Sequence, residues 1–470
     1  MAEQTVSDKP SPLLKKSRKP SAPRLSSLDA YRGFTMILLA ASGFGLAAAA
    51  NKFPESTTWQ TVGYLFSHVH WGFLPDINNK WDFAHWITIW DMIQPSFMFM
   101  VGVSMPFSYL SRKKKGDSYL RMFFHALWRA VVLVLLGIFL RSLNTKTTNW
   151  FFMDVVAQIG LGYLFLFLLW NRGFKIQLAA LVVILVGYWA WFAFTPLPDK
   201  DFDYASVGRV VLPENYAPEK ATQAEKKKYE VALLQYNGFQ AHWNKNTNPA
   251  HTFDVWFMNL FPQNHPKKGY VKVSQKEGEE QGEKQKKPVY KFAYSSGGYQ
   301  VLNFIPSLAT MLLGLMAGTL LQDNKKRTGR KLLLLLGGGL LCIALGKGLD
   351  MAGVCPIVKR IWTPTWTLFS GGLCLWLLLG FYLVMDVIRF RFWAFPAVVV
   401  GMNSIAIYVM GATMKAPVSR FLKRHFGADI YTLYGRVAVE VQPVVELSLV
   451  FIVFWLILYW MYRNKFFIRI

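Results

Sequence analysis

The sequence predicts an all-α polytopic membrane protein, a bundle of about ten transmembrane helices with a large extracytoplasmic insertion. First, 53% of its 470 residues are hydrophobic and 16% are aromatic, which points away from a soluble protein. Second, several uncharged apolar runs reach the roughly 18 to 20 residues that a helix needs to cross about 30 Å of hydrocarbon. Third, lysines and arginines concentrate at alternate ends of these runs, as they do in loops that stay in the cytoplasm.

The expected helices follow one another along the chain as about ten apolar runs. They cover residues 34–50, 92–110, 127–140, 155–170, 178–194, 302–321, 332–349, 368–387, 395–414 and 447–462. An even number of crossings places both termini on the same side of the membrane.

Basic residues decide which side that is. One set of helix ends carries the clusters at 15–24, 112–115, 325–331, 389–391 and 463–469, whereas the alternate ends carry few apart from 415–424. Short basic loops stay in the cytoplasm, so both termini are predicted to be cytoplasmic. Most of the net charge of +25 belongs to this topology signal, and we do not expect a nucleic-acid partner.

Two segments stand apart from the apolar runs. Residues 1–32 are rich in Pro, Ser and Lys without a signal-peptide pattern, and they are expected to form a disordered basic cytoplasmic tail ahead of the transmembrane domain 33–470. Residues 195–301 are expected to form an extracytoplasmic insertion between the fifth and sixth helices. Its charged piece "KVSQKEGEEQGEKQKK" favours disorder, while its aromatic, Asn-rich pieces suit either a sugar-binding surface or a cap on the bundle.

Three of the eight histidines, His68, His70 and His85, precede the second apolar run and are expected on the extracytoplasmic face. Imidazole is the side chain best matched to proton transfer near neutral pH. A structural or interfacial role is the alternative. The spacing of His68 and His70 is weak support for a metal, and the three cysteines show no metal-binding spacing, so no metal is expected.

Several motifs together resemble the heparan-α-glucosaminide N-acetyltransferase family of transmembrane acyltransferases. They are "RLSSLDAYRGFTMILL", "HVHWGF" followed by "TIWDMIQPSFMFMVGVSMPFS", "DVVAQIGLGYLF", "LNFIPSLATMLLGLMAG", "IWTPTWTLFSGG" and "GMNSIAIYVMG". The resemblance implies a bacterial-type homologue, multi-pass in the inner (plasma) membrane. It also implies transfer of an acetyl group from cytoplasmic acetyl-CoA to an amino sugar or glycan on the far side of the lipid bilayer. A homodimer is left open.

The resemblance also implies which histidine is catalytic. The family pattern of His, two residues, Trp and Gly fits His68 with Trp71 and Gly72, although the inserted "FLPDINNKWDFAH" leaves His85 as a second candidate. Acyl transfer needs a base, or a histidine that is itself acylated. Asp91 is a candidate to hold the imidazole tautomer. Its alternative role is that of a carboxylate favoured by the helix N-terminus.

Polar residues within apolar helices are candidates for binding. On the outer half, Asn303, Lys347, Asn403, Ser404 and Tyr408 are expected to hold the acyl carbonyl or the acceptor, with interhelical hydrogen bonding as the alternative. For the phosphates of acetyl-CoA the candidates are Arg32, Arg129 and Gln158, and positive-inside anchoring is the alternative for both arginines.

Two other classes of function remain. A polytopic transporter of a small solute or glycan precursor would share the buried polar groups, but the chain shows no duplicated half with matching broken helices. A noncatalytic glycan-binding protein is the third class. The acceptor, N- versus O-acylation, and acyl-histidine versus direct transfer stay open.

Overall fold

The computed structural model describes residues 25–69, 71, 87–213, 235–261, 263, 266–273 and 289–468, together with single positions between 216 and 229. The chain is mostly helical, and the described residues form one two-stranded sheet. Residues 26–32, expected to close the disordered tail, instead form the first two turns of a helix, in which Ser27 to Tyr31 are buried.

The elements in the first half of the chain are α1 (Ser26–Ala40), η1 (Ser42–Gly45), α2 (Leu46–Ala50), α3 (Thr57–Leu65), α4 (Ile89–Lys114), α5 (Tyr119–Ser142), α6 (Val155–Trp170), α7 (Phe174–Phe194), η3 (Gly238–Trp243) and α9 (Pro249–Met258). There follow β1 (Tyr270–Val273), β2 (Val289–Phe292), η4 (Val301–Asn303), α10 (Phe304–Gln322), α11 (Thr328–Met351), α12 (Pro364–Tyr382), η5 (Leu383–Val387) and η6 (Phe392–Ala394). The last elements are α13 (Phe395–Met402), α14 (Ser404–Thr413), α15 (Lys415–Phe426), η7 (Ala428–Thr432), η8 (Val439–Val441) and α16 (Gln442–Arg463).

Six to eight candidate membrane spans lie among the described residues. Six are single helices, formed by α5, α7, α10 with η4, α11, α12 with η5, and α16 with η8. Two more are bent pairs, α1 with η1 and α2 at 48°, and η6 and α13 with α14 at 74°. The runs expected at 34–50 and 395–414 are therefore broken rather than continuous helices.

Each break has a local cause. Between α1 and α2 the backbone turns through Gly43 and Phe44, which have φ angles of 60° and 55°. Between α13 and α14, Asn403 leaves the helical region at φ −126° and ψ 43°. Its side chain donates to the carbonyl of Phe466 and accepts from the backbone N–H of Ile468, so the C-terminal segment satisfies its polar groups.

Close backbone contacts hold the centre of the bundle, where α4 packs along α10. A Cβ on Gly102 would lie 1.9 Å from the carbonyl oxygen of Met311, and one on Gly314 would lie 2.0 Å from that of Phe99. Lipid tails are as apolar as the helices, so the hydrophobic effect does not drive helices together in a membrane. Small residues at the contact let the two backbones approach closely, and this packing holds the helices together. The outward faces of α5, α7 and α11 carry exposed large apolar residues, as expected for helices that face acyl chains.

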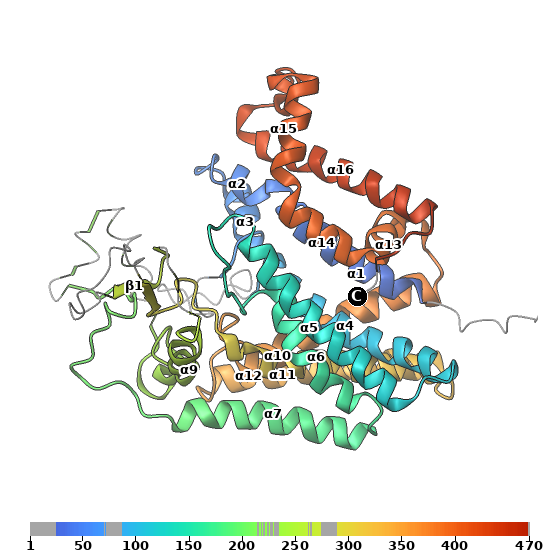
Figure 1. Cartoon of the computed structure of the whole chain (residues 1–470), viewed down its shortest axis with the longest axis horizontal. Helices are drawn as coiled ribbons and strands as arrows, with labels where there is room; N and C mark the ends of the chain where they lie inside the picture. Colours follow the sequence, from blue (N-terminus) through green and yellow to red (C-terminus); the bar gives the residue numbers. More distant parts are fainter. Residues whose placement is uncertain are drawn as a thin grey trace, which may run out of the picture.

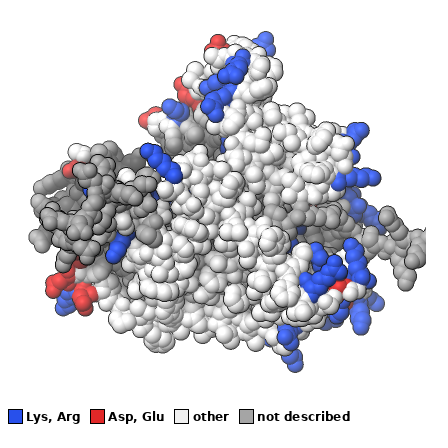
Figure 2. Space-filling model, in the orientation of Figure 1, with Lys and Arg blue, Asp and Glu red and all other residues white. Residues whose placement is uncertain are grey.

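The insertion folds at one end of the bundle, where α9 and the hairpin β1–β2 lie together in Figure 1. The hairpin is antiparallel, with Tyr270 opposite Phe292 and Val273 opposite Val289. Trp243 of η3 is fully buried, so the aromatic, Asn-rich piece is folded structure. Figure 2 shows lysines and arginines gathered at the opposite end, where α4 and α16 end in Arg112, Lys113, Lys114 and Arg463, and a further basic group over α15.

Candidate active site

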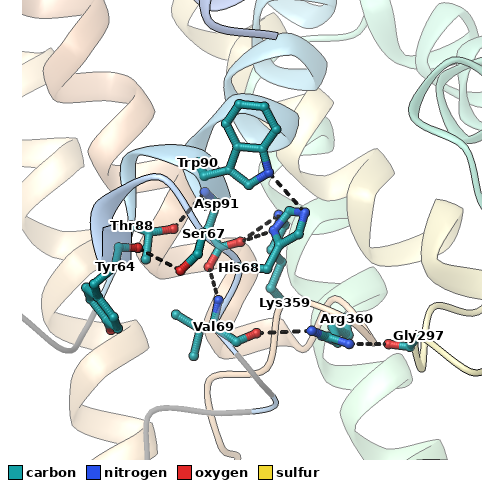
Figure 3. Close-up of polar contacts among 10 residues, drawn as sticks. All are labelled: Tyr64, Ser67, His68, Val69, Thr88, Trp90, Asp91, Gly297, Lys359 and Arg360. Atoms are coloured by element: carbon teal, nitrogen blue, oxygen red, sulfur yellow. Dashed lines mark hydrogen bonds and ion pairs between the residues drawn. The ribbon is translucent and has the colours of Figure 1, made fainter. Parts of the chain in front are cut away.

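His68 and Asp91 meet at the N-terminal end of α4. The Nδ1 atom of His68 lies 2.7 Å from Oδ1 of Asp91, while Oδ2 of Asp91 accepts from the backbone N–H of Val69 at 3.1 Å (Figure 3). His68 follows α3 by three residues, and Asp91 lies in the first turn of α4. The sequence interpretation named Asp91 as a candidate to hold the imidazole tautomer, and in the structure its carboxylate lies against the ring of His68.

Asp91 is placed by the way in which α4 begins. Thr88 caps the helix, and its Oγ1 accepts from the backbone N–H of Asp91 at 2.9 Å. A carboxylate in the first turn also interacts favourably with the helix N-terminus. Asp91 therefore lies at the helix N-terminus and contacts His68 at the same time, because the capped first turn of α4 lies beside the loop that carries His68.

Two basic residues between α11 and α12 complete the cluster. Lys359 is 8% exposed, and its Nζ lies 2.8 Å from Oδ1 of Asp91 and 3.3 Å from Nδ1 of His68. Arg360 donates to the carbonyl of Gly297 at 2.7 Å and more weakly to that of Val69 at 3.4 Å (Figure 3). Arg360 thereby ties the end of the insertion to the backbone beside His68.

The contacts of His68 define its tautomer. The indole Nε1 of Trp90 lies 3.2 Å from Nε2 of His68, and an indole N–H can only donate. Nε2 is therefore the acceptor, and in neutral imidazole the proton lies on Nδ1, directed at Asp91. This arrangement leaves Nε2 as the basic nitrogen and Asp91 as the group that orients the ring.

The surroundings favour neutral imidazole. Burial lowers the pKa of His68 below its ordinary value of 6.5, and the positive charges of Lys359 and Arg360 lower it further, against the opposite effect of Asp91. The lowered pKa thus favours an unprotonated ring at neutral pH, with Nε2 as its basic nitrogen. Such a group can take a proton from an attacking amine or accept an acyl group.

Comparison with known proteins agrees with this chemistry. The chain is 23% identical over 421 residues to heparan-α-glucosaminide N-acetyltransferase of Homo sapiens, covering 82% of this chain and 52% of the relative. It is 23% identical over 403 residues to the Mus musculus protein of the same name, covering 84% and 54%. This chain is a distant relative of the heparan-α-glucosaminide N-acetyltransferases. It spans about half the length of these curated relatives, and no family model matches it.

Two of the polar residues that the sequence predicted to bind the acceptor support the loop that carries Lys359. Asn303 donates to the carbonyl of Arg360 at 2.7 Å, and its own Oδ1 is buried without a hydrogen-bond partner among the described residues. Lys347 pairs with Asp350 at 2.8 Å, and the same carboxylate accepts from the backbone N–H of Ile357. Both residues therefore hold the α11–α12 loop against the cluster.

The other three acceptor candidates have contacts away from His68. Asn403 binds the C-terminal segment, and Ser404 follows it as the first residue of α14. Tyr408 donates to Oδ1 of Asp154 at 2.5 Å, and Asp154 pairs with Arg141 at 2.7 Å. This second cluster links α14 to α5 and α6, and none of the contacts of these three residues involves His68.

The donor candidates lie on the helices. Arg32 of α1 donates to the hydroxyl of Ser104 on α4. Arg129 of α5 donates to the hydroxyl of Tyr163 at 3.1 Å, and its Nε is buried without a hydrogen-bond partner in the described part of the chain. Gln158 donates to the carbonyls of Phe152 and Val301 at 2.9 Å, which makes it a tie between α6 and η4.

Arg129 has polar neighbours that the sequence interpretation did not propose for the donor site. The guanidinium of Arg112 lies 2.6 Å from Nε2 of His125, and a buried pair of tyrosines, Tyr109 and Tyr163, lies between their helices. His125 Nδ1 and Trp170 Nε1 are also buried without hydrogen-bond partners among the described residues. Buried polar atoms normally find partners, so this group of donors has spare capacity for an anion.

His70 and His85 lie outside the described residues. Within the ranges that the structure describes, no group of three or more His, Cys, Asp or Glu side chains could hold a metal ion. The sequence interpretation missed Lys359, Arg360 and Trp90, although Trp90 lies inside the quoted "TIWDMIQP" and the two basic residues directly precede "IWTPTW". A Lys-Arg pair between two apolar runs, on the side where basic residues are scarce, was the signal that could have found them.

Proposed function

We propose that this protein is an acetyl-CoA-dependent transmembrane N-acetyltransferase, which moves an acetyl group from cytoplasmic acetyl-CoA to an amino sugar or glycan on the opposite side of the membrane. The observation that carries the proposal is the cluster of His68, Asp91 and Lys359, in which an imidazole of lowered pKa is oriented by a buried carboxylate. The distant relationship to two acetyltransferases supports the reaction class.

The proposed topology has about ten crossings. Besides the six single and two bent spans, α4 has 26 residues and α6 has 16, and a 26-residue helix is about 39 Å long at 1.5 Å per residue. Gln94, Pro95 and Pro106 lower the hydropathy of α4, but α10 and its neighbours shield that helix. Both termini are proposed to be cytoplasmic in a multi-pass protein of a bacterial inner membrane. The insertion 195–301 and His68 then lie outside.

On the cytoplasmic side, Arg129 with Arg112 and His125 is proposed to receive phosphates of acetyl-CoA. Guanidinium groups bind phosphate with paired, charge-assisted hydrogen bonds. Arg129 still has a free Nε among its described contacts, and nearby donors are likewise unsatisfied. Arg32 is proposed to contribute from α1, whereas Gln158 acts through its ties to the backbone. Acetyl-CoA is a substrate here, and the chemistry requires no metal.

At the outer end, the basic Nε2 of His68 would take the proton of the acceptor amine as the nitrogen attacks the thioester carbonyl. The carbon–sulfur bond then breaks, and the CoA thiolate leaves and takes up that proton. Alternatively, Nε2 itself attacks first and displaces the CoA thiolate, and the acceptor amine then takes the acetyl group from the imidazole and gives up its proton to the thiolate. In both routes His68 becomes positively charged, and the carboxylate of Asp91 stabilises that charge. In the resting state the positive charge of Lys359 compensates the negative charge of Asp91. The imidazole therefore stays neutral until it takes the proton.

The outer polar groups are proposed to act around this centre. Asn303 offers a buried, unpartnered Oδ1 beside Arg360 and is the acceptor contact with the best local support. Lys347 acts by holding the α11–α12 loop. Tyr408 is proposed to shape another wall of the acceptor site, where its contact with Asp154 joins α14 to α6. Asn403 and Ser404 are proposed to act through the break in that span, since Asn403 contacts the C-terminal segment and Ser404 begins α14. His85 stays the alternative catalytic histidine.

A second candidate function is transport of a small solute or glycan precursor. The two bent spans favour it, because discontinuous helices are common at transporter binding sites. A transporter needs no basic imidazole at its outer face, so replacement of His68 distinguishes the two functions.

The test is acetyl transfer by purified protein in detergent, with radiolabelled acetyl-CoA and a panel of amino sugars and glycans. We expect label in an amino-sugar product, and none with His68→Ala. Absence of turnover with every acceptor, together with uptake of solute by the same protein in sealed proteoliposomes that His68→Ala does not change, would overturn the enzyme proposal in favour of transport. Glycan binding with neither activity would support the noncatalytic class.

A further inference from the structure

Trp90 contacts the nitrogen that the proposed reaction requires. Its indole N–H donates to Nε2 of His68 at 3.2 Å, with the two ring centroids 6.2 Å apart and the planes inclined by 59° (Figure 3). Nδ1 of the same imidazole faces Asp91 at 2.7 Å. Both ring nitrogens of His68 are therefore occupied in this structure, although 43% of the side chain is exposed.

The position of the indole is built into the fold. Trp90 is the second residue of α4, and its six-membered ring lies over Gly43 in the break between α1 and α2. A Cβ at Gly43 would come within 3.3 Å of Cζ3 of Trp90 and 2.8 Å of Cδ1 of Phe66. Gly43 also has a φ of 60°, which favours glycine. The break thus leaves space for the six-membered ring of Trp90, and in this position the indole N–H reaches His68.

We propose that Trp90 is a positioning residue that masks the Nε2 lone pair of His68 in the resting protein and must turn away before the imidazole can act. A lone pair that accepts a hydrogen bond cannot at the same time take a proton or attack a carbonyl. The indole is half-exposed and its N–H bond lies at the surface, so it has room to move. The importance of this mask rests on the function proposed for His68.

The mask has a clear chemical consequence. With Nε2 covered, the thioester of a donor that arrives before an acceptor meets no free base, and its reaction with water is slowed. Release of the N–H would also strengthen the base, because a donor to Nε2 stabilises the neutral imidazole and so holds its pKa down. The charged groups that face the ring are Asp91 from α4 and Lys359 and Arg360 from the α11–α12 loop.

The experiment measures nucleophilicity without acetyl-CoA or acceptor. Purified protein is treated with diethyl pyrocarbonate, which modifies unprotonated imidazole, and the rate at His68 is followed by peptide mass spectrometry. We expect Trp90→Phe to raise that rate about fivefold, as loss of one ordinary net hydrogen bond would allow, and to shift its pH inflection upward. A variant that only loosened the loop carrying His68 could raise the rate, but it would not move the pH at which the rate changes.

Matched controls are available within the chain. Trp59→Phe removes an indole N–H from α3, where Trp59 stacks on Phe53, and should leave the rate at His68 unchanged. Modification of His242 and His425 provides internal standards. If Trp90→Phe does not yield monodisperse protein, Trp90→Met removes the same N–H. Equal rates and equal inflections in the wild type and either Trp90 variant would overturn the mask, and they would leave the acetyltransferase proposal to its own activity test.

Discussion

At the scale of single residues, the candidate site depends on one carboxylate oxygen. Oδ1 of Asp91 receives both the imidazole of His68 and the ammonium of Lys359. Buried charges of this kind are stable only when they are paired, and removing one partner leaves the other uncompensated. The cluster therefore links the protonation of His68 to two side chains from distant parts of the chain.

The first prediction separates the histidines. His68→Ala should lower acetyl transfer by about 10² to 10⁴, the usual contribution of a positioned base, while His70→Ala and His85→Ala keep most of it. The comparison is made at matched levels of folded protein, with His425→Ala as a surface control. An inactive His85→Ala beside a nearly normal His68→Ala would show that the inserted residues supply the catalytic imidazole.

The second prediction concerns pH. His68 must be neutral to act, and its pKa lies below 6.5, so activity should be present at neutral pH and be lost as pH falls through that lowered pKa. Lys359→Met removes a positive charge that lowers the pKa, while the opposing effect of Asp91 remains, so the acidic limb should move to higher pH. The measurement is the pH dependence of kcat/KM.

Lys326→Met is the control for that shift, since it removes a partly exposed ion pair with Asp323 at the other end of the bundle. Its acidic limb should match the wild type. An unshifted limb in Lys359→Met would show that the ammonium does not act on His68.

The third prediction tests the donor site. Arg129→Ala should weaken acetyl-CoA binding. It removes a guanidinium with an unsatisfied buried Nε from the group that Arg129 forms with Arg112 and His125. Loss of one charge-assisted contact corresponds to roughly 10-fold or more in Kd, measurable by calorimetry. Arg121→Ala, whose side chain is 77% exposed, is the matched control. Unchanged affinity in both Arg129→Ala and Arg32→Ala would place the phosphates elsewhere.

At the scale of elements, close backbone contact decides how the helices pack. α4 and α10 approach through glycines, and α1 lies on α13 in the same manner, with Gly33 against the carbonyl of Ala397. Where two helices pack this closely, the contact that fixes their middle also fixes the position of their ends. The first turn of α4, which carries Trp90 and Asp91, is thus held by the centre of the bundle.

The fourth prediction follows from that contact. Gly314→Leu should destabilise the bundle, because its Cβ would lie 2.0 Å from the carbonyl oxygen of Phe99 and the two helices must separate. Overpacking commonly costs about 1–3 kcal/mol, which should appear as a lower Tm in detergent. Gly337→Leu is the control, since nothing lies within 4 Å of the added Cβ. Equal Tm values for both variants would contradict this account of the packing.

At the scale of the whole molecule, charge is distributed unevenly between the two ends. The insertion gathers at one end, and Arg112, Lys113, Lys114 and Arg463 lie at the other, where Figure 2 shows basic side chains. In the proposed reaction, an acetyl group that enters from the basic end must travel along the bundle to reach His68. Arg129 with its neighbours and the cluster of His68, Asp91 and Lys359 are the proposed start and end of that path.

The fifth prediction tests the orientation. A cysteine introduced as Glu279→Cys in the insertion should react with a membrane-impermeant maleimide added outside, and one introduced as Lys326→Cys should react only after the membrane is opened. Cys355 and Cys374 are buried and Cys342 is half-buried, so replacing all three leaves no background. Labelling of Glu279→Cys from the cytoplasmic side alone would contradict the proposed topology.

The sequence by itself determined the helical class, the apolar segments and the relationship to acetyltransferases. Apolar runs such as 155–170 and 302–321 match α6 and α10 closely, because the length of an apolar run and its flanking charges are local properties. It also indicated His68 with Asp91. Only the tertiary structure placed Lys359 and Trp90 on the same imidazole, bent the spans at Gly43 and Asn403, and gave Tyr408 and Asn303 different partners. These outcomes depend on which distant side chains fill one buried space, and such contacts leave no periodic pattern along a single chain.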